Sequence, residues 1–354
     1  MYRIAAGGAT CGSVAFHQEP KRISWGESHK KLEIRMATLP TGANFKRAQI
    51  LWELGLHIAG NPETKYGGNR DMCITVGSGA GEEMKPWLRF STGSAIMAHS
   101  VASGDIDMAF VNPSALLTQA YRGTGVFQSP LPLRIIANYP SMDRFVILMR
   151  ASLGFKSLHD VKKARYPLQI SLREDPTHST LVLVEQLLAF YGMSLEEIKS
   201  WGGGVHPAGP PNDKRRLAGI RDGSLDAVFD EGISIWIEEA LSHGMGLINL
   251  EPEAFEHLGA IGWRKVKLST GRFAHLPDYD CIDFSGWPLY ARADLPEKVA
   301  YDICAALGAR HDNMTWEKGT HEGIAQTGRE TDATPMDVPM HPGAERWFRE
   351  QGSI

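Results

Sequence analysis

Two ten-residue stretches of this chain share one pattern and align without a gap. "SGDIDMAFVN", residues 103–112, matches "DGSLDAVFDE", residues 222–231, and the alignment pairs Gly104 with Gly223. Each copy follows a helical pattern and precedes a polar turn and a further helical pattern. A repeated unit of this kind predicts two lobes of similar build. The alternative is that the two copies share only the common order of helix, glycine end and buried strand.

Strand-like and helix-like patterns alternate along most of the chain. "LEIRMATL", residues 32–39, places apolar residues on one face of a strand, and residues 45–60 carry apolar residues at helical spacing. The same order returns with a strand at residues 166–172 and a helix at residues 177–192. This alternation is typical of an α/β fold with mainly parallel sheets. A chain of 354 residues has room for about two domains.

Composition and charge exclude several classes of function. The net charge is −4 with acids and bases interspersed, so we predict no nucleic-acid partner. No stretch approaches the roughly 18 uninterrupted apolar residues of a membrane span. The cysteines are widely spaced, and we interpret them as buried apolar residues rather than ligands: Cys11, Cys73, Cys281 and Cys304. The sequence therefore predicts no metal and no cofactor.

Polar residues open several predicted helices directly after or near predicted strands. In an open α/β sheet, ligands bind outside the carboxyl ends of the strands, and helix N-termini favour anions. The polar residues at these predicted helix starts are Ser91, Thr92, Gly93 and Ser94 in one turn, Asn112 and Ser114 in the second, and Thr177, His178, Ser179 and Thr180 in the third. We expect these turns to line one cleft and to hold the carboxylate of a small solute.

Six further residues are candidates for the same site, each with an alternative role. Arg173 is expected to form a bidentate contact with a carboxylate of the solute, and its replacement by alanine is expected to change the stability of the ligand-free protein very little. The alternative role is a surface ion pair with a neighbouring acid. Asp230 and Glu231 are expected to bind an amine or to cap the helix that follows. Trp287 is expected to stack on the solute, or else to be a core or hinge aromatic residue. Thr41 and Asn44, in the first helix turn, are expected to contact the solute or simply to cap that helix.

Catalytic motifs are absent from the sequence. It contains no HExxH, GxSxG or Walker A pattern, and its histidines do not have metal-ligand spacing. We therefore predict binding rather than catalysis. The alternatives are an enzyme that uses the same cleft, with His178 as acid, base or nucleophile, and a cytoplasmic sensor domain on the same fold.

Four segments resemble the TAXI family, the solute receptors of TRAP transporters. They are "STGSAIMAHSVASGDIDMAFVN", "SLHDVKKARYPLQISLREDPTHSTLVLVEQLLAFYG", "GSLDAVFD" and "DVPMHPGAERWFREQG". The resemblance spans roughly residues 31–351 and implies a two-lobed periplasmic binding protein type II fold, with the ligand cleft between lobes joined by a hinge. It further implies a small organic solute, of the amino acid or carboxylate class, that is passed to a TRAP-type membrane permease.

The order of the patterns also predicts domain boundaries. Residues 1–31 read as an N-terminal arm, 31–132 plus 262–354 as the first lobe, and 133–261 as the second lobe. The chain would return to the first lobe through "DYDCIDFSGWPLYAR", so two crossings would form the hinge. The first residues do not read as a signal peptide, and the family resemblance favours the periplasm over the cytoplasm.

Overall fold

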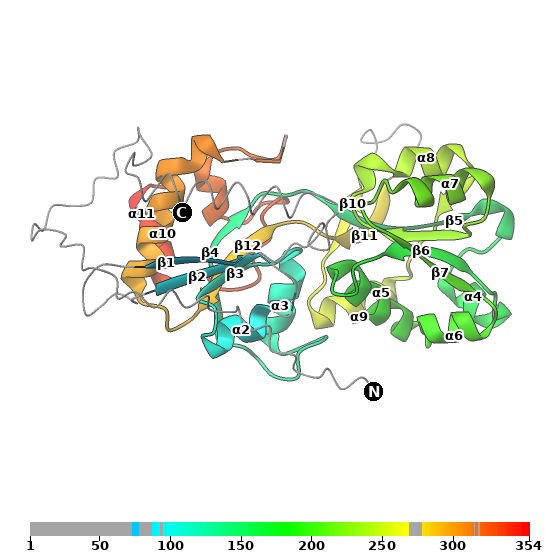
Figure 1. The fold of residues 1–354 in the computed structure, drawn as a ribbon, viewed down its shortest axis with the longest axis horizontal. Helices are drawn as coiled ribbons and strands as arrows, with labels where there is room; N and C mark the ends of the chain where they lie inside the picture. Colours follow the sequence, from blue (N-terminus) through cyan, green and yellow to red (C-terminus); the bar gives the residue numbers. More distant parts are fainter. Residues whose placement is uncertain are drawn as a thin grey trace, which may run out of the picture.

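A computed structural model describes residues 73–77, 87–92, 95, 97–268, 278–314, 316–317 and 319–354. These residues form a mixed α/β protein with two sheets. The five-stranded sheet lies in the left part of Figure 1 and the seven-stranded sheet in the right part. The predicted N-terminal arm, the strand at 32–39 and the helix at 45–60 lie outside the described residues, as do Thr41, Asn44, Gly93 and Ser94.

The five-stranded sheet has the order β1-β2-β3-β12-β4. Strands β2 and β3 are parallel, and β12 runs antiparallel to both β3 and β4. Helices α2 and α3 cover one face, and α10 and α11 cover the other (Figure 1). The bounds are β1 Cys73–Gly77, β2 Trp87–Thr92, α2 Met97–Ser103, β3 Met108–Phe110, α3 Ser114–Arg122, β4 Leu133–Tyr139, β12 Trp287–Arg292, α10 Glu297–Arg310 and α11 Pro342–Glu350.

The seven-stranded sheet has the order β10-β11-β5-β8-β6-β7, with β9 also paired to β5. Strand β6 is parallel to both β7 and β8. Helices α7 and α8 cover one face, and α4, α5, α6 and α9 cover the other (Figure 1). The bounds are β5 Arg144–Arg150, α4 Leu158–Ala164, β6 Gln169–Arg173, α5 Ser179–Phe190, α6 Leu195–Ser200, β7 Gly204–Ala208, α7 Lys214–Asp222, β8 Ala227–Asp230, α8 Ile237–Ser242, β9 Met245–Leu247, α9 Pro252–Ile261, β10 Lys265–Leu268 and β11 Tyr279–Asp283.

Short 3-10 helices complete the described structure. They are η1 Ala151–Leu153, η2 Ile233–Ile235, η3 His311–Asn313 and η4 Ile324–Gly328.

The two copies of the repeated pattern lie in different sheets. The first copy ends α2 and forms β3, and the second ends α7 and forms β8. Gly104 and Gly223 follow the two helices with φ angles of 87° and 83°. Side chains disfavour this left-handed region, which explains a glycine at both positions.

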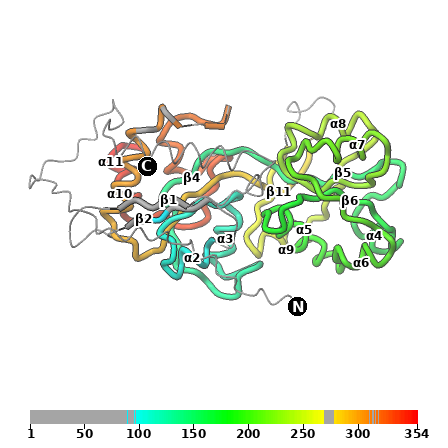
Figure 2. The backbone as a smooth tube through the Cα atoms, viewed as in Figure 1, coloured from blue at the N-terminus to red at the C-terminus, as the bar shows by residue number. Residues whose placement is uncertain are grey.

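The chain passes between the two sheets in two adjacent segments, residues 140–143 and 284–286 (Figure 2). The main chains of the segments are hydrogen-bonded, because the amide of Gly286 donates to the carbonyl of Ser141 over 3.1 Å. Beside them, Nη1 of Arg144 lies 2.8 Å from Oδ1 of Asp283 in a buried ion pair. We name residues 140–143 and 284–286 the crossing segments.

The crossing segments differ from the expected boundaries at residues 132/133 and 261/262. Strand β4 belongs to the five-stranded sheet because it pairs with β12, and β10 and β11 belong to the seven-stranded sheet because β11 pairs with β5. Local patterns along the chain do not encode which sheet a strand joins. The motion of two lobes about a hinge stays a prediction.

The two parts of the molecule also touch away from the crossing segments. One hydrophobic core cluster contains Leu116 of α3 and Leu183 of α5. Next to them, Nε2 of Gln119 donates to Oε1 of Gln186 over 3.3 Å. The starts of α3 and α5, which the sequence assigns to one site, therefore belong to helices that pack against each other.

Candidate functional site

Predicted site residues meet at the carboxyl ends of two neighbouring strands. Arg173 is the last residue of β6, and Asp230 is the last residue of β8, followed by Glu231. Because β6 and β8 are parallel neighbours, their carboxyl ends lie at the same edge of the sheet. The sheet order therefore brings together residues that lie 57 positions apart in the sequence.

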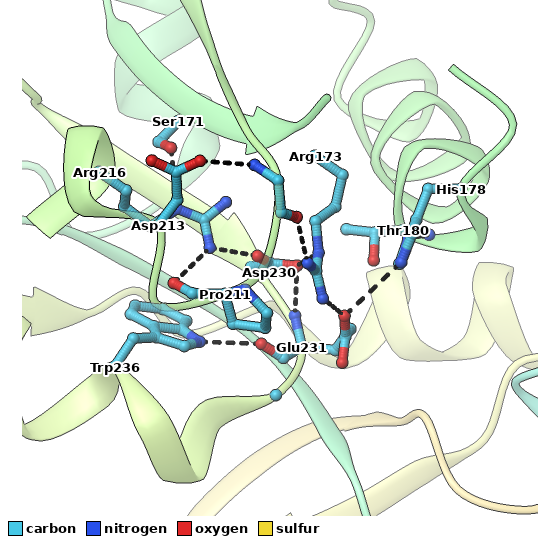
Figure 3. Close-up of polar contacts among 12 residues, drawn as sticks. Ser171, Arg173, His178, Thr180, Pro211, Asp213, Arg216, Asp230, Glu231 and Trp236 are labelled. Carbon is cyan, nitrogen blue, oxygen red and sulfur yellow. Dashed lines mark hydrogen bonds and ion pairs between the residues drawn. The ribbon is translucent and has the colours of Figure 1, made fainter. Parts of the chain in front are cut away.

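Arg173 is buried, and each of its three side-chain nitrogens donates to a protein group. Its Nε donates to Oδ1 of Asp230 over 3.0 Å, its Nη2 donates to Glu231, and its Nη1 donates to the carbonyl of Gly209 over 2.6 Å (Figure 3). The expected alternative, a surface ion pair with a neighbouring acid, is wrong. Glu174 instead accepts from the exposed Arg215, over 2.8 Å.

Arg173, Asp230 and Glu231 form a buried charged cluster. Arg216, which was not among the predicted site residues, also belongs to it. Its guanidinium pairs with the second carboxylate oxygen of Asp230, and its Nε donates to Oγ of Ser171 over 2.9 Å. Asp230 is 0% exposed, so two guanidinium groups hold one buried carboxylate. Arg216 lies four residues before the buried Ile220 on α7, a position at which helical periodicity predicts an apolar residue.

The start of α5 faces this cluster. The N-cap of the helix is His178, whose Nδ1 accepts from the amide of Thr180 over 3.2 Å, while its Nε2 lies 3.8 Å from Oε1 of Glu231. The hydroxyl of Thr180 is buried without a hydrogen-bond partner and points toward Arg173 and Glu231 in Figure 3. Thr177 instead donates to Asp175 over 2.8 Å, within its own loop.

Hydrogen bonds at the starts of α3 and α5 join the two parts of the molecule, and they involve Asn112, Ser114 and Ser179. Oγ of Ser179 donates to the carbonyl of Asn112, at the start of α3. Oγ of Ser114 accepts from Nδ2 of Asn138 over 3.2 Å, and its amide donates to the carbonyl of Ser285 in a crossing segment. Two of the three predicted turns, at α3 and α5, therefore meet.

The first predicted turn has a different structure. Ser91 and Thr92 lie in β2, where they pair with Ala109 and Phe110 of β3, and α2 begins only at Met97. The expectation that Ser91 and Thr92 cap a helix is wrong, because the parallel pairing with β3 extends the strand through them.

Asp230 and Glu231 do not cap the short helix that follows them. Gly232 is the N-cap of η2 without a side-chain cap, and its amide donates to the carboxyl group of Asp143. The carbonyl of Glu231 accepts from the indole N–H of Trp236 over 2.8 Å. Both predicted carboxylates thus face Arg173 rather than a helix end.

Trp287 begins β12 directly after a crossing segment. Its side chain is 44% exposed, and it pairs in register with Tyr139 of β4. This exposure leaves its indole available for the expected stacking on a solute. Trp287 nevertheless belongs to the five-stranded sheet, whereas the charged cluster belongs to the seven-stranded sheet.

Burial and charge set the protonation of the acids at this edge. Burial would raise the pKa of Glu231, but the hydrogen bond from Asp143 and the charge of Arg173 outweigh it and lower the pKa. Burial, followed by the hydrogen bond and charge of Glu231, raises the pKa of Asp143 well above its usual range. The two shifts therefore favour the ionised form of Glu231 and the protonated form of Asp143.

Of two cavities in the described part of the chain, the smaller is lined in part by Ser171 and Arg216 and the larger lies away from the charged cluster. One of about 230 Å³ lies between α7 and strands β6 and β7, and one of about 610 Å³ lies along the end of α2 and the end of β12. The described residues contain no group of three or more His, Cys, Asp or Glu that could hold a metal ion. Among these same residues, every helix is too short or too polar to span a membrane.

Comparisons with known proteins give one family match and several similar folds. The profile of the NMT1-like family matches residues 280–352, which include β12, α10 and α11. Similar structures are type II periplasmic binding proteins. The alkanesulfonate-binding protein SsuA from Xanthomonas axonopodis pv. citri, bound to MOPS, is 12% identical, with 73% of this chain and 70% of that chain covered and a TM-score of 0.28.

Two further structures have slightly higher scores. PhnD1 from Prochlorococcus marinus, in complex with methylphosphonate, is 13% identical over 74% of this chain and 84% of that chain, with a TM-score of 0.36. Lactococcal OpuAC, in complex with glycine betaine, is 13% identical over 73% of this chain and 82% of that chain, with a TM-score of 0.35.

Proposed function

We propose that this chain is a periplasmic solute-binding protein that captures a small carboxylate-bearing solute between two lobes and delivers it to a TRAP-type membrane permease. The observation that carries the proposal is the buried cluster of Arg173, Asp230 and Glu231 at the start of α5. A guanidinium and a helix N-terminus at the carboxyl end of a parallel strand together favour a carboxylate.

The charges of the cluster favour an amino acid over a plain organic acid. The positive charges of Arg173 and Arg216 are balanced by the carboxylates of Asp230 and Glu231. A guest carboxylate that binds Nη2 of Arg173 displaces Glu231, and the free Glu231 carboxylate then accepts the guest ammonium. A zwitterion thus leaves every charge paired, whereas a plain anion leaves Glu231 buried and unpaired, which is costly.

The start of α5 provides further donors for the guest carboxylate. Thr180 is 0% exposed and its hydroxyl has no partner, although buried polar groups are normally hydrogen-bonded. A guest carboxylate on Arg173 would accept from this hydroxyl. Because α5 has 12 residues, its dipole adds partial positive charge at the same place.

The alternative of an enzyme in the same cleft requires His178 to exchange protons with a substrate. Nδ1 of His178 already accepts from the amide of Thr180, and Nε2 faces Glu231. This arrangement supports a structural role for His178 at the helix start, and it favours binding over catalysis.

Calorimetry with three matched guests tests the proposal: an amino acid, its deaminated acid and its decarboxylated amine. We expect the amino acid to bind most tightly. Glu231→Gln should weaken its binding by about 2 to 3 kcal/mol, or roughly 30- to 150-fold, because a charge-assisted hydrogen bond is lost. Mass spectrometry of the recovered guest completes the test, since a chemically altered guest would point to the enzyme instead.

A further inference from the structure

Helix α3 is buried on nearly all sides, although it belongs to the five-stranded part of the molecule. Residues 114–120 are all buried, and none of them is charged. A surface helix normally turns one polar or charged face to water. Here one side of α3 covers the five-stranded sheet, and the other side contacts α5 and the end of α9 (Figure 1). Helix α3 therefore lies between the two parts of the molecule.

Two glutamine side chains lie at the centre of this contact. Nε2 of Gln119 donates to Oε1 of Gln186 over 3.3 Å, and Nε2 of Gln186 donates to Oε1 of Gln119 over 3.1 Å. The indole N–H of Trp263, which lies between α9 and β10, also donates to Oε1 of Gln186, over 2.6 Å. Gln119 is 0% exposed, so its side-chain amide exchanges water for hydrogen bonds to the other part of the molecule.

The turn after α3 adds a second polar contact. Oγ1 of Thr124 donates over 2.7 Å to the carbonyl of Ile261, the last residue of α9, where helix carbonyls lack partners within the helix. Gly262 follows with a φ of 117°, and a Cβ there would lie 3.1 Å from Cγ of Gln119. We name the following five residues the α3 contact: Gln119 and Thr124 on one side, and Gln186, Ile261 and Trp263 on the other.

The α3 contact lies away from the crossing segments along the axis of α3. The helix begins beside a crossing segment, where the amide of Ser114 donates to the carbonyl of Ser285 over 3.1 Å. Gln119 lies about 7.5 Å further along the helix at 1.5 Å per residue, and Thr124 follows the helix end. A rotation about the crossing segments moves distant atoms most, so it would separate the α3 contact first.

The α3 contact needs no solute and no charged group. Its hydrogen bonds join neutral groups, and the same helices share an apolar cluster that includes Leu116 and Leu183. Two domains move freely relative to each other unless the interface between them is large and apolar. Opening this interface would expose apolar side chains of both helices to water, which is unfavourable.

We propose that the α3 contact holds the two parts of the molecule together in the solute-free protein, so that the closed arrangement is the resting state. In addition, and resting on the function proposed above, the contact opens to admit a solute and closes again behind it. Variants that weaken the contact shift the population toward the open arrangement and speed the exchange of solute.

Small-angle X-ray scattering of the solute-free protein tests the resting state. Gln119→Glu combined with Gln186→Glu places two carboxylates opposite each other, and they repel and resist burial. We expect its radius of gyration to exceed that of the natural protein by about 1 Å, on about 20 Å for a compact chain of 354 residues. The control is Gln326→Glu, because Gln326 is buried but bonded within the five-stranded part, and its radius should not change.

An unchanged radius of gyration in the double variant would overturn the proposal. Circular dichroism checks that each variant is folded. Should the two carboxylates prevent folding, Gln119→Ala combined with Thr124→Ala removes the polar contacts without adding charge. The same increase is expected there, and a radius equal to that of the natural protein would overturn the proposal equally.

Stopped-flow fluorescence with L-alanine as the probe tests the role in solute entry. Gln119→Ala leaves Nε2 of Gln186 without its partner unless the two parts separate. We expect the association and dissociation rate constants both to rise by roughly tenfold, the equivalent of one hydrogen bond. Gln326→Ala is the control and should leave both rates unchanged, and unchanged rates in Gln119→Ala would contradict the role in entry. If L-alanine does not bind, this role falls with the proposed function, and the scattering result alone decides the resting state.

Discussion

Nε of Arg173 donates to Oδ1 of Asp230 over 3.0 Å, with both side chains buried in the seven-stranded sheet. This pair joins two strands that are neighbours in space but distant in sequence. Arg173 is thus part of the internal structure of the protein as well as a candidate ligand-binding group, and each of the two roles has its own experimental consequence.

Arg173→Ala is expected to destabilise the ligand-free protein by about 3 to 5 kcal/mol, because it leaves the carboxylates of Asp230 and Glu231 buried without their partner. This differs from the expectation from sequence, in which Arg173 contributed little to stability. Denaturant titration monitored by fluorescence measures the change. The matched control is Arg215→Ala, which removes an exposed ion pair with Glu174 and should cause a much smaller loss. Equal losses in the two variants would contradict the buried pairing.

Thr180→Val should raise the free energy of unfolding of the ligand-free protein by about 1 kcal/mol, because it replaces a buried unpaired hydroxyl with a methyl group of similar shape. It should also weaken amino acid binding by roughly two- to tenfold through the loss of one hydrogen bond. Denaturation and calorimetry on one preparation measure both effects. The adjacent Ser179→Ala is the control: it loses the bond to Asn112 and should be less stable than the natural protein.

Gly286→Ala is expected to destabilise the protein more than Gly154→Ala does. Both glycines have positive φ angles, 78° and 74°, so each substitution carries backbone strain of about 1 to 2 kcal/mol. A Cβ at Gly286 would lie 2.3 Å from Oγ of Ser114, whereas a Cβ at Gly154 would meet nothing within 4 Å. The steric clash should add about 1 to 3 kcal/mol at Gly286 alone. Thermal denaturation of the two variants compares them, and similar midpoints would argue against close packing at the crossing segment.

The raised pKa of Asp143 predicts how stability changes with pH. The folded protein retains the proton of the Asp143 carboxyl group at pH values where the unfolded chain has lost it. The contribution of Asp143 to stability is therefore fully present below its pKa in the unfolded chain and is lost as the pH rises through its pKa in the folded protein. Asp143→Asn lacks this dependence. Its thermal midpoint relative to the natural protein should therefore increase as the pH rises from about 4 toward neutrality. A difference that stays constant over this range would show that Asp143 does not hold a proton in the folded state.

Much of the local structure could be predicted from the sequence. The apolar pattern of residues 166–172 indicated a strand, and β6 is found there. Gly104 and Gly223 indicated helix ends, because few other residues adopt a positive φ. The grouping of five site residues also came from the sequence, since polar residues after parallel strands meet at one edge of a sheet. These residues are Arg173, His178, Thr180, Asp230 and Glu231.

The sequence by itself thus determined the α/β class, the repeated pattern and some of the polar residues that gather at the strand ends, whereas Arg216 was missed and Ser91 and Thr92 lie within β2. Only the tertiary structure decided which of them are paired. Arg173 binds Asp230 and Glu231 rather than its neighbours in sequence, and Arg216 and Asp143 join them, because β8 lies between β5 and β6 in the sheet. Local periodicity does not encode strand order. Burial then requires each charge in the interior to be paired or protonated, and that requirement acts only on groups that the fold has already brought together.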